Sequence, residues 1–430
     1  MLAFHYPPTT EVGGLRAAKV ARALADAGYH VTVIRAHSDS RAASAPEHPS
    51  VDVISITVPA GPRQWLADIR SSDRSPPPSR QGEAPVWRPP ATVPLWKRIL
   101  YSVLWLPDDQ QGFVIPAAKT AVECLRQGGP VLLYSTSPPP SVQLAALACQ
   151  IVTGATWVAE LRDPWTDNPG KPWYCRTALT DWIERQLERI CLNRADLVVA
   201  VSEGVRRLAR DKQRPGVRAP VLVRNGIDGL VENIPARPQD RPFRIVHIGT
   251  LYLGRDPRPF LAALAVAVRR LRLPPERLRV ELIGKSETFD GNSIREYADS
   301  LGIGPFVSFE PWLPHETAQE RIRTADLLLL LAEGQPDQVP NKLYEYLATR
   351  QRILAFADRP GETANLLERV GGHLVVNSAD SSLDEVVANA IAPQRTGEST
   401  SNEVLAELAT PRQMVALLRE LASLPIRIIR

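Results

Sequence analysis

The segment from Ala325 to Arg350 places a cation and a carboxylate where a nucleotide could bind. It opens on the apolar run Leu327 to Leu331, which is typical of a strand buried on both faces of a parallel sheet. After a polar loop, Pro340 suits the first turn of a helix, because it lacks an N–H that would find no partner there. Lys342 and Glu345 then lie on one face of that helix, near its positive end. An ordinary strand-to-helix turn with solvated charges fits the same spacing, so both interpretations stay open.

Other candidate residues follow the remaining predicted strands. Ligands of doubly wound α/β folds bind beyond the carboxyl ends of strands, so residues just past each strand are the ones to consider. These are Gly13-Gly14, Ser137 to Pro140, Arg162 to Trp165, Asn225-Gly226, Gly249 to Arg255, Gly284-Lys285 and Asp337 to Glu345. A glycine turn needed only for loop geometry explains Gly13 and Gly14 equally well. His5 and His247, on or near strands, are expected to be packed rather than catalytic.

The elements that must position these residues alternate between strand and helix in the first half of the chain. Strand Leu2–Tyr6, a glycine loop, helix Leu15–Ala27 and strand His30–Arg35 open a Rossmann-like domain. The further elements expected are Val51–Val58, Leu95–Leu106, Val131–Thr136, Ser141–Thr153, Trp157–Leu161, Thr177–Arg194, Leu197–Val201, Glu203–Arg210 and Val221–Arg224. Ser202 is the expected N-cap of the helix that starts at Glu203.

A second α/β region begins after the linker-like segment Gly229 to Pro242. Its expected strands are Phe243–Ile248, Leu278–Ile283, Val307–Phe309, Leu327–Leu331, Ile353–Ala357 and His373–Val376. Its expected helices are Pro257–Leu271, Ser293–Leu301, His315–Thr324, the helix after Pro340, Glu362–Val370, Leu383–Ile391 and Ala406–Leu424. Two α/β domains joined near residue 230 are the simplest organisation for a chain of 430 residues.

The segment of about 59–94 interrupts the first region. It is rich in Pro, Ser and Arg and predicts a mobile insertion, because it cannot bury enough apolar area to order itself. Trp65, Trp87, Trp96 and Trp105 lie in and beside it, with basic residues interleaved. The stretch Trp65–Trp105 therefore suits peripheral contact with membrane headgroups. Packing of these tryptophans against the domain is the alternative.

Composition excludes several classes of protein. The net charge of +4 is spread along the chain, so nucleic acid is not an expected partner. The four cysteines form no CxxC pair and are expected to be reduced, which favours the cytoplasm. No apolar run could cross a membrane and no signal-peptide pattern opens the chain. No DxD, HExxH or Cys/His cluster suggests a metal site.

Several motifs, in order, resemble those of GT-B glycosyltransferases of the family 4 type. The stretch GGLRAAKVARALADAGYHVTVI is similar to the first segment of the family's sequences. The stretch ADLVVAVSEGVRRL, followed by VRNGID, is similar to the end of the family's first domain. FRIVHIGTLYLGRDPRPFLAAL, VELIGK and PNKLYEYLATRQRILA are similar to segments of its second domain. The forms RDPW, GTLYLGRDP and SPPPS resemble one branch of the family. The resemblance covers nearly the whole chain apart from the Pro-rich segment.

This resemblance implies an α/β fold of the GT-B type, with two Rossmann-like domains facing across a cleft. Residues 1–228 would hold the acceptor, 229–410 the nucleotide-sugar donor, and a C-terminal helix in 411–430 would pack back on the first domain. The implied activity is hexosyl transfer to an acceptor hydroxyl of a glycan, lipid-linked sugar or small molecule. The family usually retains anomeric configuration and needs no metal, so no cofactor is expected. Basic side chains and helix N-termini must then neutralise the diphosphate leaving group.

The resemblance also implies residue roles. Arg255 and Lys342 would neutralise the diphosphate, and Glu345 would bind ribose hydroxyls. The full set implied to bind the donor is Gly13, Gly14, Gly249, Thr250, Arg255, Lys285, Asn341, Lys342, Leu343 and Glu345. The set implied to act in catalysis is Arg162, Asp163 and Asp337.

Three residues depart from the family's pattern. Thr250 stands where an arginine is usual, so Lys342 or Lys285 would supply the missing cation. Asp337 replaces a glutamate, and Arg162 stands where many members have a histidine before Asp163. Asp163 would orient the acceptor or the donor sugar, although an N-cap or an ion pair with Arg162 explains it equally. Thr250 and Asp337 keep open the alternative of a catalytically silent scaffold that partners an active transferase. A nucleotide-sugar epimerase of the same fold is a second alternative.

Overall fold

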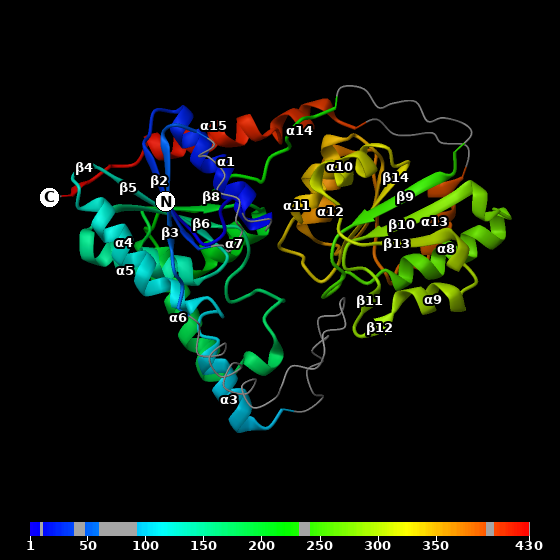
Figure 1. The fold of residues 1–430 in the computed structure, drawn as a ribbon, viewed down its shortest axis with the longest axis horizontal. Helices are drawn as coiled ribbons and strands as arrows, with labels where there is room; N and C mark the ends of the chain where they lie inside the picture. Colours follow the sequence, from blue (N-terminus) through cyan, green and yellow to red (C-terminus); the bar gives the residue numbers. More distant parts are fainter. Residues whose placement is uncertain (9–11, 38–47, 60–92, 232–240, 393–399, 430) are drawn as a thin grey trace. The chain divides into compact units, whose positions relative to one another are not determined.

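The computed structural model describes residues 1–8, 12–37, 48–59, 93–231, 241–392 and 400–429 (Figure 1). Contacts divide the chain into two units. Unit 1 comprises Met1–Arg224 and Met414–Arg430, and unit 2 comprises Asn225–Gln413. Most of the segment predicted as an insertion, including Trp65 and Trp87, lies outside the described residues. No helix in the described ranges is long and apolar enough to span a bilayer.

Unit 1 is built on a parallel sheet with strand order β3-β2-β1-β5-β6-β7-β8. The strands are β1 (Leu2–Ala3), β2 (Val31–Ala36), β3 (Val51–Ile56), β5 (Leu132–Ser137), β6 (Thr156–Leu161), β7 (Leu197–Ala200) and β8 (Val221–Leu222). Its helices are α1 (Val12–Asp26), α3 (Leu95–Leu104), α4 (Val114–Leu125), α5 (Ser141–Thr153), α6 (Ala178–Arg194), α7 (Glu203–Lys212) and most of α15 (Thr410–Ala422).

Both faces of this sheet are covered, because consecutive strand residues point to opposite sides. Val158 packs on the side of α1 and α15, whereas its neighbour Trp157 packs on the side of α4, α5 and α6. The end of the chain also attaches here. Strand β17 (Ile428–Ile429) pairs antiparallel with β4 (Gly129–Pro130), and Arg427 forms a 2.7 Å ion pair with Asp196. Unit 1 is thus completed by residues from both ends of the sequence (Figure 1).

Unit 2 has a second parallel sheet, with strand order β13-β10-β9-β14-β15-β16. The strands are β9 (Phe243–Ile248), β10 (Leu278–Ile283), β13 (Val307–Glu310), β14 (Leu327–Ala332), β15 (Ile353–Ala357) and β16 (Leu374–Val376). The helices are α8 (Arg258–Leu271), α9 (Ile294–Ser300), α10 (His315–Arg323), α11 (Asn341–Ala348), α12 (Glu362–Val370), α13 (Leu383–Ile391) and α14 (Asn402–Glu407). A short hairpin joins β11 (Thr288–Phe289) to β12 (Asn292–Ser293).

The long apolar run of β14 is explained by its position inside this sheet. Leu327, Leu329 and Leu331 pack toward α8, α9 and α13, while Leu328 and Leu330 pack toward α10, α11 and α12. All residues of β14 are buried, as the run predicts for a strand covered on both faces.

The structure confirms most predicted elements and corrects a few. The Ser202 N-cap is confirmed, since its hydroxyl accepts from the backbone N–H of Val205 at 3.2 Å. Helix α4 was not expected. The predicted strand Leu2–Tyr6 is paired only over Leu2–Ala3, and the predicted tail helix is two helices, α14 and α15. The predicted helix Leu95–Leu106 is α3, which ends at Leu104 before Pro107, a residue that lacks the N–H a helix needs.

Candidate functional site

Lys342 brings an ammonium group to the carboxyl end of β9 in unit 2. It lies in the first turn of α11, and its Nζ donates a hydrogen bond to the carbonyl of Ile248. Gly249, the first residue after β9, has a φ of 151°, and a Cβ there would overlap the Lys342 ammonium. Glycine is therefore required at this position, because a side chain would displace the cation.

The Lys342 ammonium is held near a second cation. Burial lowers the pKa of Lys342 to about 7, and the charge of Arg255 acts in the same direction, while Glu345 opposes them. Two like charges removed from water disfavour each other, and a bound anion reverses that penalty. This part of unit 2 therefore suits an anionic ligand.

Arg255 reaches this place because the loop after β9 is held against the loop after β14. Gly254 forms a backbone bridge with Glu333, and a Cβ on Gly254 would overlap the Glu333 carbonyl. The Arg255 guanidinium lies 4.3 Å from the centroid of the Tyr252 ring and donates to Gln335 Oε1 at 3.4 Å. Stacking on the ring fixes the plane of the guanidinium without removing its charge.

His247, on β9, adds a neutral imidazole to the same neighbourhood. Its Nδ1 lies 2.9 Å from the carbonyl oxygen of Leu329, which can only accept, so Nδ1 carries the proton. Burial lowers the pKa of His247 to about 3, and the charges of Lys342 and Arg255 act in the same direction. The ring is fully buried, in agreement with the expectation of a packed histidine. Its Nε2 has no hydrogen-bond partner among the described residues.

Helix α11 is fastened to β9 so that its first turn stays in place. The backbone N–H of Ile248 donates to the Tyr346 hydroxyl at 3.1 Å, and the side chain of Leu343 is fully buried in the core. Asn341 Nδ2 donates to Glu345 Oε1 at 3.2 Å on the half-buried side of the helix. The N–H groups of the first turn and the positive end of the helix dipole add to the attraction for anions.

In unit 1, Arg162 ties three segments together at the carboxyl edge of the sheet. Its guanidinium donates to the carbonyls of Gly13, Ser137 and Pro138, at 3.2 Å for Ser137 and 2.7 Å for Pro138. A Cβ on Gly13 would lie 3.1 Å from Arg162 Nη1, so the glycine allows this close approach. Burial lowers the pKa of Arg162, while the charges of Glu160 and Asp163 support its protonated form. Within unit 1, Arg162 thus joins its own loop to Gly13 and to the loop that begins at Ser137.

Comparison with known proteins identifies a domain in the first half of the chain. A family model described as a glycosyl transferase 4-like domain matches residues 13–226, the part that includes the Arg162 loops. The chain carries a glycosyl transferase 4-like domain. No curated protein matches the chain.

Solved structures resemble the chain over nearly its full length. They include Anabaena Alr3699/HepE in complex with UDP and glucose (14% identity, TM-score 0.63, covering 98% of this chain and 99% of that one). Sucrose-phosphate synthase from Thermosynechococcus elongatus has 17% identity and a TM-score of 0.56, with 97% and 92% covered. A UDP-forming trehalose-phosphate synthase from Burkholderia xenovorans has 13% identity and a TM-score of 0.59, with 98% of each chain covered. The fold is GT-B, as expected, with two parallel sheets of seven and six strands.

The remaining predicted site residues of unit 2 fall on loops near Lys342. Thr250 follows Gly249 and is half-buried, and Lys285 is exposed in the loop after β10. The two loops are joined by a 3.0 Å hydrogen bond from the Leu251 N–H to the Lys285 carbonyl. Asp337 is half-buried in the loop that leads to α11. The structure thus brings Lys342, Arg255 and Glu345 into electrostatic contact. The roles of these three residues and of Asp337, Thr250 and Lys285 in donor binding stay predictions.

The glycosyl transferase 4-like domain also contains a buried ion pair that sequence reasoning missed. Glu160, on β6, accepts from Arg16 Nε at 3.0 Å, from the Tyr134 hydroxyl at 2.7 Å and from Thr136 Oγ1 at 2.6 Å. Arg16 also donates to the carbonyls of Val223 and Arg224. Burial works against ionisation, but the Arg16 charge and these hydrogen bonds lower the pKa of Glu160. A glutamate inside the apolar strand TWVAEL was the signal available in the sequence.

This ion pair positions the first turn of α1, which contains Gly13 and Gly14. Arg16 lies in the first turns of α1, so its bonds to β6 and to the residues after β8 fix where the helix begins. Gly14 is buried, and Gly13 is half-buried against Arg162. Asp163 follows Arg162 and is half-buried. Within the described residues, no group of three or more His, Cys, Asp or Glu side chains is arranged to hold a metal ion.

Proposed function

We propose that the protein is a glycosyltransferase that moves a sugar from a nucleotide diphosphate sugar to an acceptor hydroxyl. The observation that carries this proposal is the Lys342 ammonium near Arg255 at the N-terminus of α11. A diphosphate fits both parts of that arrangement, because it is a compact polyanion and a helix N-terminus offers it N–H donors. The match to a glycosyl transferase 4-like domain supports the sugar-transfer chemistry.

In this mechanism the cations act on the leaving group. As the glycosidic bond breaks, charge develops on the diphosphate, and Lys342 and Arg255 stabilise that charge. Lys342 is half-buried, so the interaction is stronger than it would be in water. Glu345 accepts hydrogen bonds from the ribose hydroxyls, and Asp337 lies near the transferred sugar. Lys285 and Thr250 complete the donor contacts.

The acceptor is assigned to the glycosyl transferase 4-like domain. Arg162 holds the first turn of α1 and the Ser137–Pro140 loop in place through its bonds to the carbonyls of Gly13, Ser137 and Pro138. Asp163 orients the incoming hydroxyl or the donor sugar from the position next to Arg162. Transfer of a hexose with retention, without a metal, completes the proposal. Proton NMR of the anomeric signal at early reaction times tests the stereochemistry.

Isothermal titration calorimetry with UDP, GDP and ADP tests the donor site. UDP is a natural first ligand, because a solved structure of similar fold is a complex with UDP. Arg255→Ala and Glu345→Ala should each weaken nucleotide binding by about tenfold or more, since each removes a charged or hydrogen-bonded contact. Arg270→Ala is the matched control, because Arg270 is exposed near the C-terminal end of α8, away from the carboxyl edge of the sheet.

Two outcomes would overturn the proposal. One is that the wild-type protein binds none of the three nucleotides. The other is that Arg255→Ala and Glu345→Ala bind as well as Arg270→Ala. If a nucleotide sugar is bound but never hydrolysed or transferred, the chain is a silent scaffold instead. If the donor is converted without any acceptor to an epimeric nucleotide sugar, the chain is an epimerase.

We further propose a cytoplasmic enzyme that contacts the inner face of a membrane. None of the four cysteines, which all lie in the described residues, forms a disulfide, which supports a reducing compartment. Exposed tryptophans beside basic residues in unit 1 support the membrane contact.

A further inference from the structure

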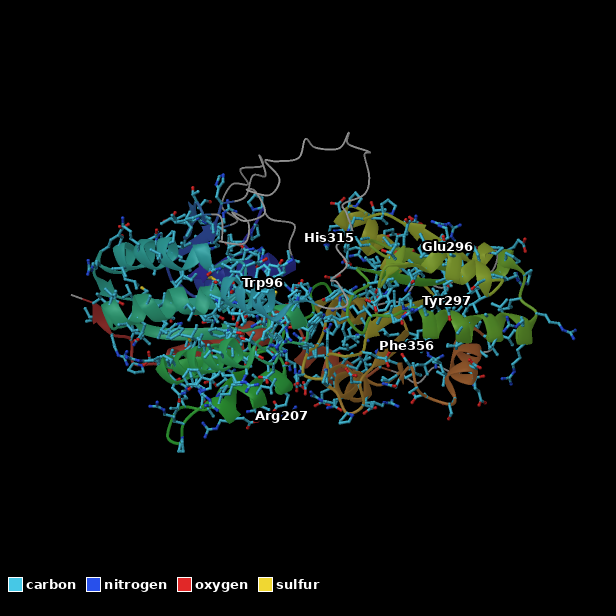
Figure 2. All side chains as sticks on the ribbon, turned by 90° about the horizontal axis from the view of Figure 1, so that it is seen from below. Trp96, Arg207, Glu296, Tyr297, His315 and Phe356 are labelled. Carbon is cyan, nitrogen blue, oxygen red and sulfur yellow. The ribbon has the colours of Figure 1, made fainter. Side chains whose placement is uncertain are left out.

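Helix α3 presents an apolar face to solvent. Its exposed residues are Leu95, Trp96, Ile99, Leu100 and Val103, with exposed fractions between 38% and 67%. At about 100° per residue, these five side chains span roughly 140° of the helix circumference without a polar interruption. The helix contacts the domain through Ser102, whose buried hydroxyl lies 3.4 Å from Thr177 Oγ1, and through Tyr101, whose ring centroid lies 6.3 Å from that of Tyr174. Figure 2 shows Trp96 on the side of unit 1 turned toward the viewer.

This face continues onto neighbouring segments of unit 1. Trp173, in the short turn Trp173–Cys175, and Leu179 and Trp182, at the start of α6, are also exposed. Arg98 connects the segments, because it donates to the Arg176 carbonyl at 3.2 Å and lies 5.5 Å from the centroid of the Trp173 ring. We call the eight exposed residues the α3 surface, namely Leu95, Trp96, Ile99, Leu100, Val103, Trp173, Leu179 and Trp182.

The charges around the α3 surface are basic. Helix α3 contains Lys97 and Arg98 and no acidic residue, and Arg185 is exposed on α6. The acidic residues at the start of α6 are already paired. Asp181 forms an ion pair with Arg176 at 3.2 Å, and Glu184 is buried against Lys171 at 2.6 Å. A partner therefore binds this surface most strongly if it is apolar at the centre of the contact and negatively charged at its rim.

We propose that the α3 surface rests on an anionic lipid bilayer. An exposed apolar patch of this kind marks an interaction site. Tryptophans next to lysine and arginine suit the headgroup region, where the rings enter the acyl boundary and the cations stay with the phosphates. This inference rests on the proposed membrane contact and names its surface. It would keep the glycosyl transferase 4-like domain next to acceptors embedded in the membrane.

Vesicle co-sedimentation of the full chain tests this surface. The probes are phosphatidylcholine vesicles with and without phosphatidylglycerol. The wild-type protein should sediment with the anionic vesicles and be released by salt, because the charge interaction is screened. Trp96→Ala and Trp182→Ala should each weaken binding by about fivefold or more. Trp312→Ala is the matched control, since Trp312 is similarly exposed, 56% against 61% for Trp96, but belongs to unit 2.

The results separate this inference from its rivals. Absence of binding to anionic vesicles, or equal binding by Trp96→Ala and Trp312→Ala, would overturn it. A dimer in analytical ultracentrifugation that Trp96→Ala converts to monomer would assign the surface to a second copy of the chain. UDP titration on the same samples keeps the two proposals distinct. If the protein binds UDP but no vesicles, only the membrane role of the α3 surface is overturned. If it binds vesicles but no nucleotide, only the proposed donor site is overturned.

Discussion

At the scale of single residues, the donor site depends on where one ammonium group is placed. Lys342 lies against the end of β9, and Gly249 provides the space that it occupies. Burial and Arg255 make the ammonium costly in the ligand-free protein, so a negatively charged ligand recovers more energy here than at a solvated lysine. Because the pKa of Lys342 is about 7, nucleotide binding should depend on pH near neutrality.

UDP affinity should fall as pH rises above about 7. The Lys342 pKa of about 7 leaves the amine mostly neutral above that pH, and a bound diphosphate favours the ammonium, so binding then takes up a proton. Titration calorimetry in buffers of different ionisation enthalpy measures this uptake. Lys342→Met should bind more weakly and lose the uptake. The same uptake in Lys342→Met would show that another group titrates.

The free energy of unfolding of the ligand-free protein should also depend on pH through Lys342. The folded pKa of Lys342 is lowered from its ordinary value of 10.5 to about 7, so between these values the unfolded chain binds more protons. The contribution of Lys342 to the free energy of unfolding is therefore complete above pH 10.5 and is lost as pH falls to about 7. Urea denaturation of wild type and Lys342→Met across this range compares the two slopes.

At the scale of elements, α1 is fixed to the sheet by the Arg16–Glu160 ion pair. The pair joins the first turns of α1 to the centre of β6 at 2.9 Å, with both side chains buried. Such a pair positions elements more than it stabilises them, because desolvation offsets most of the attraction. The placement of Gly13 and Gly14, in the first turn of α1, depends on that position.

Arg16→Met should destabilise unit 1 by about 3–5 kcal/mol, because it leaves the Glu160 carboxylate buried without its cation. The double variant Arg16→Met/Glu160→Met should be more stable than Arg16→Met alone. Arg22→Ala is the control on the same helix, since Arg22 is exposed and 3.9 Å from Asp26. Its cost should stay within about 1 kcal/mol. Urea denaturation followed by circular dichroism measures the three variants, and a double variant no more stable than Arg16→Met would contradict the pairing.

At the scale of the whole molecule, unit 1 is closed by the end of the chain. Leu417 and Leu421 of α15 pack with residues of α1, β1 and β2 in one buried cluster. The chain therefore enters unit 2 after Arg224 and returns to unit 1 at Met414. The two segments of unit 1 are separated by more than 180 residues, from Arg224 to Met414. Bringing them together closes a long loop, and the entropy lost in closing it slows folding.

Leu417→Ala should destabilise unit 1 by about 2–5 kcal/mol, since it leaves a cavity in a fully buried position. Hydrogen exchange should show faster exchange in β1, β2 and β5, with β9 and β10 unchanged. Val415→Ala is the control, because Val415 lies on the exposed side of α15. Equal loss of protection in β9 and β10 would contradict the assignment of the tail to unit 1.

The sequence by itself determined the order of elements, because apolar periodicity, prolines and caps act over a few residues. Strand β14, the Ser202 cap and the start of α11 after Pro340 all follow from such local patterns. The shared face of Lys342 and Glu345 follows from helix geometry in the same way. Motif order was informative enough to indicate the GT-B fold. Helix α4 escaped prediction because Pro116 lies in its first turn, where it resembles a helix-breaking residue, and glycines lie close to both of its ends.

Only the tertiary structure decided which of these residues meet. Arg16 and Glu160 are 144 positions apart, and Arg162 reaches a carbonyl 149 positions away. Gly249 makes room for the Lys342 ammonium, although nothing local to either residue indicates the other. Such contacts depend on how strands are ordered in the sheet, and the carboxyl ends of parallel strands collect loops from distant parts of the chain. The burial that lowers the pKa of Lys342 arises in the same way, from packing rather than from spacing.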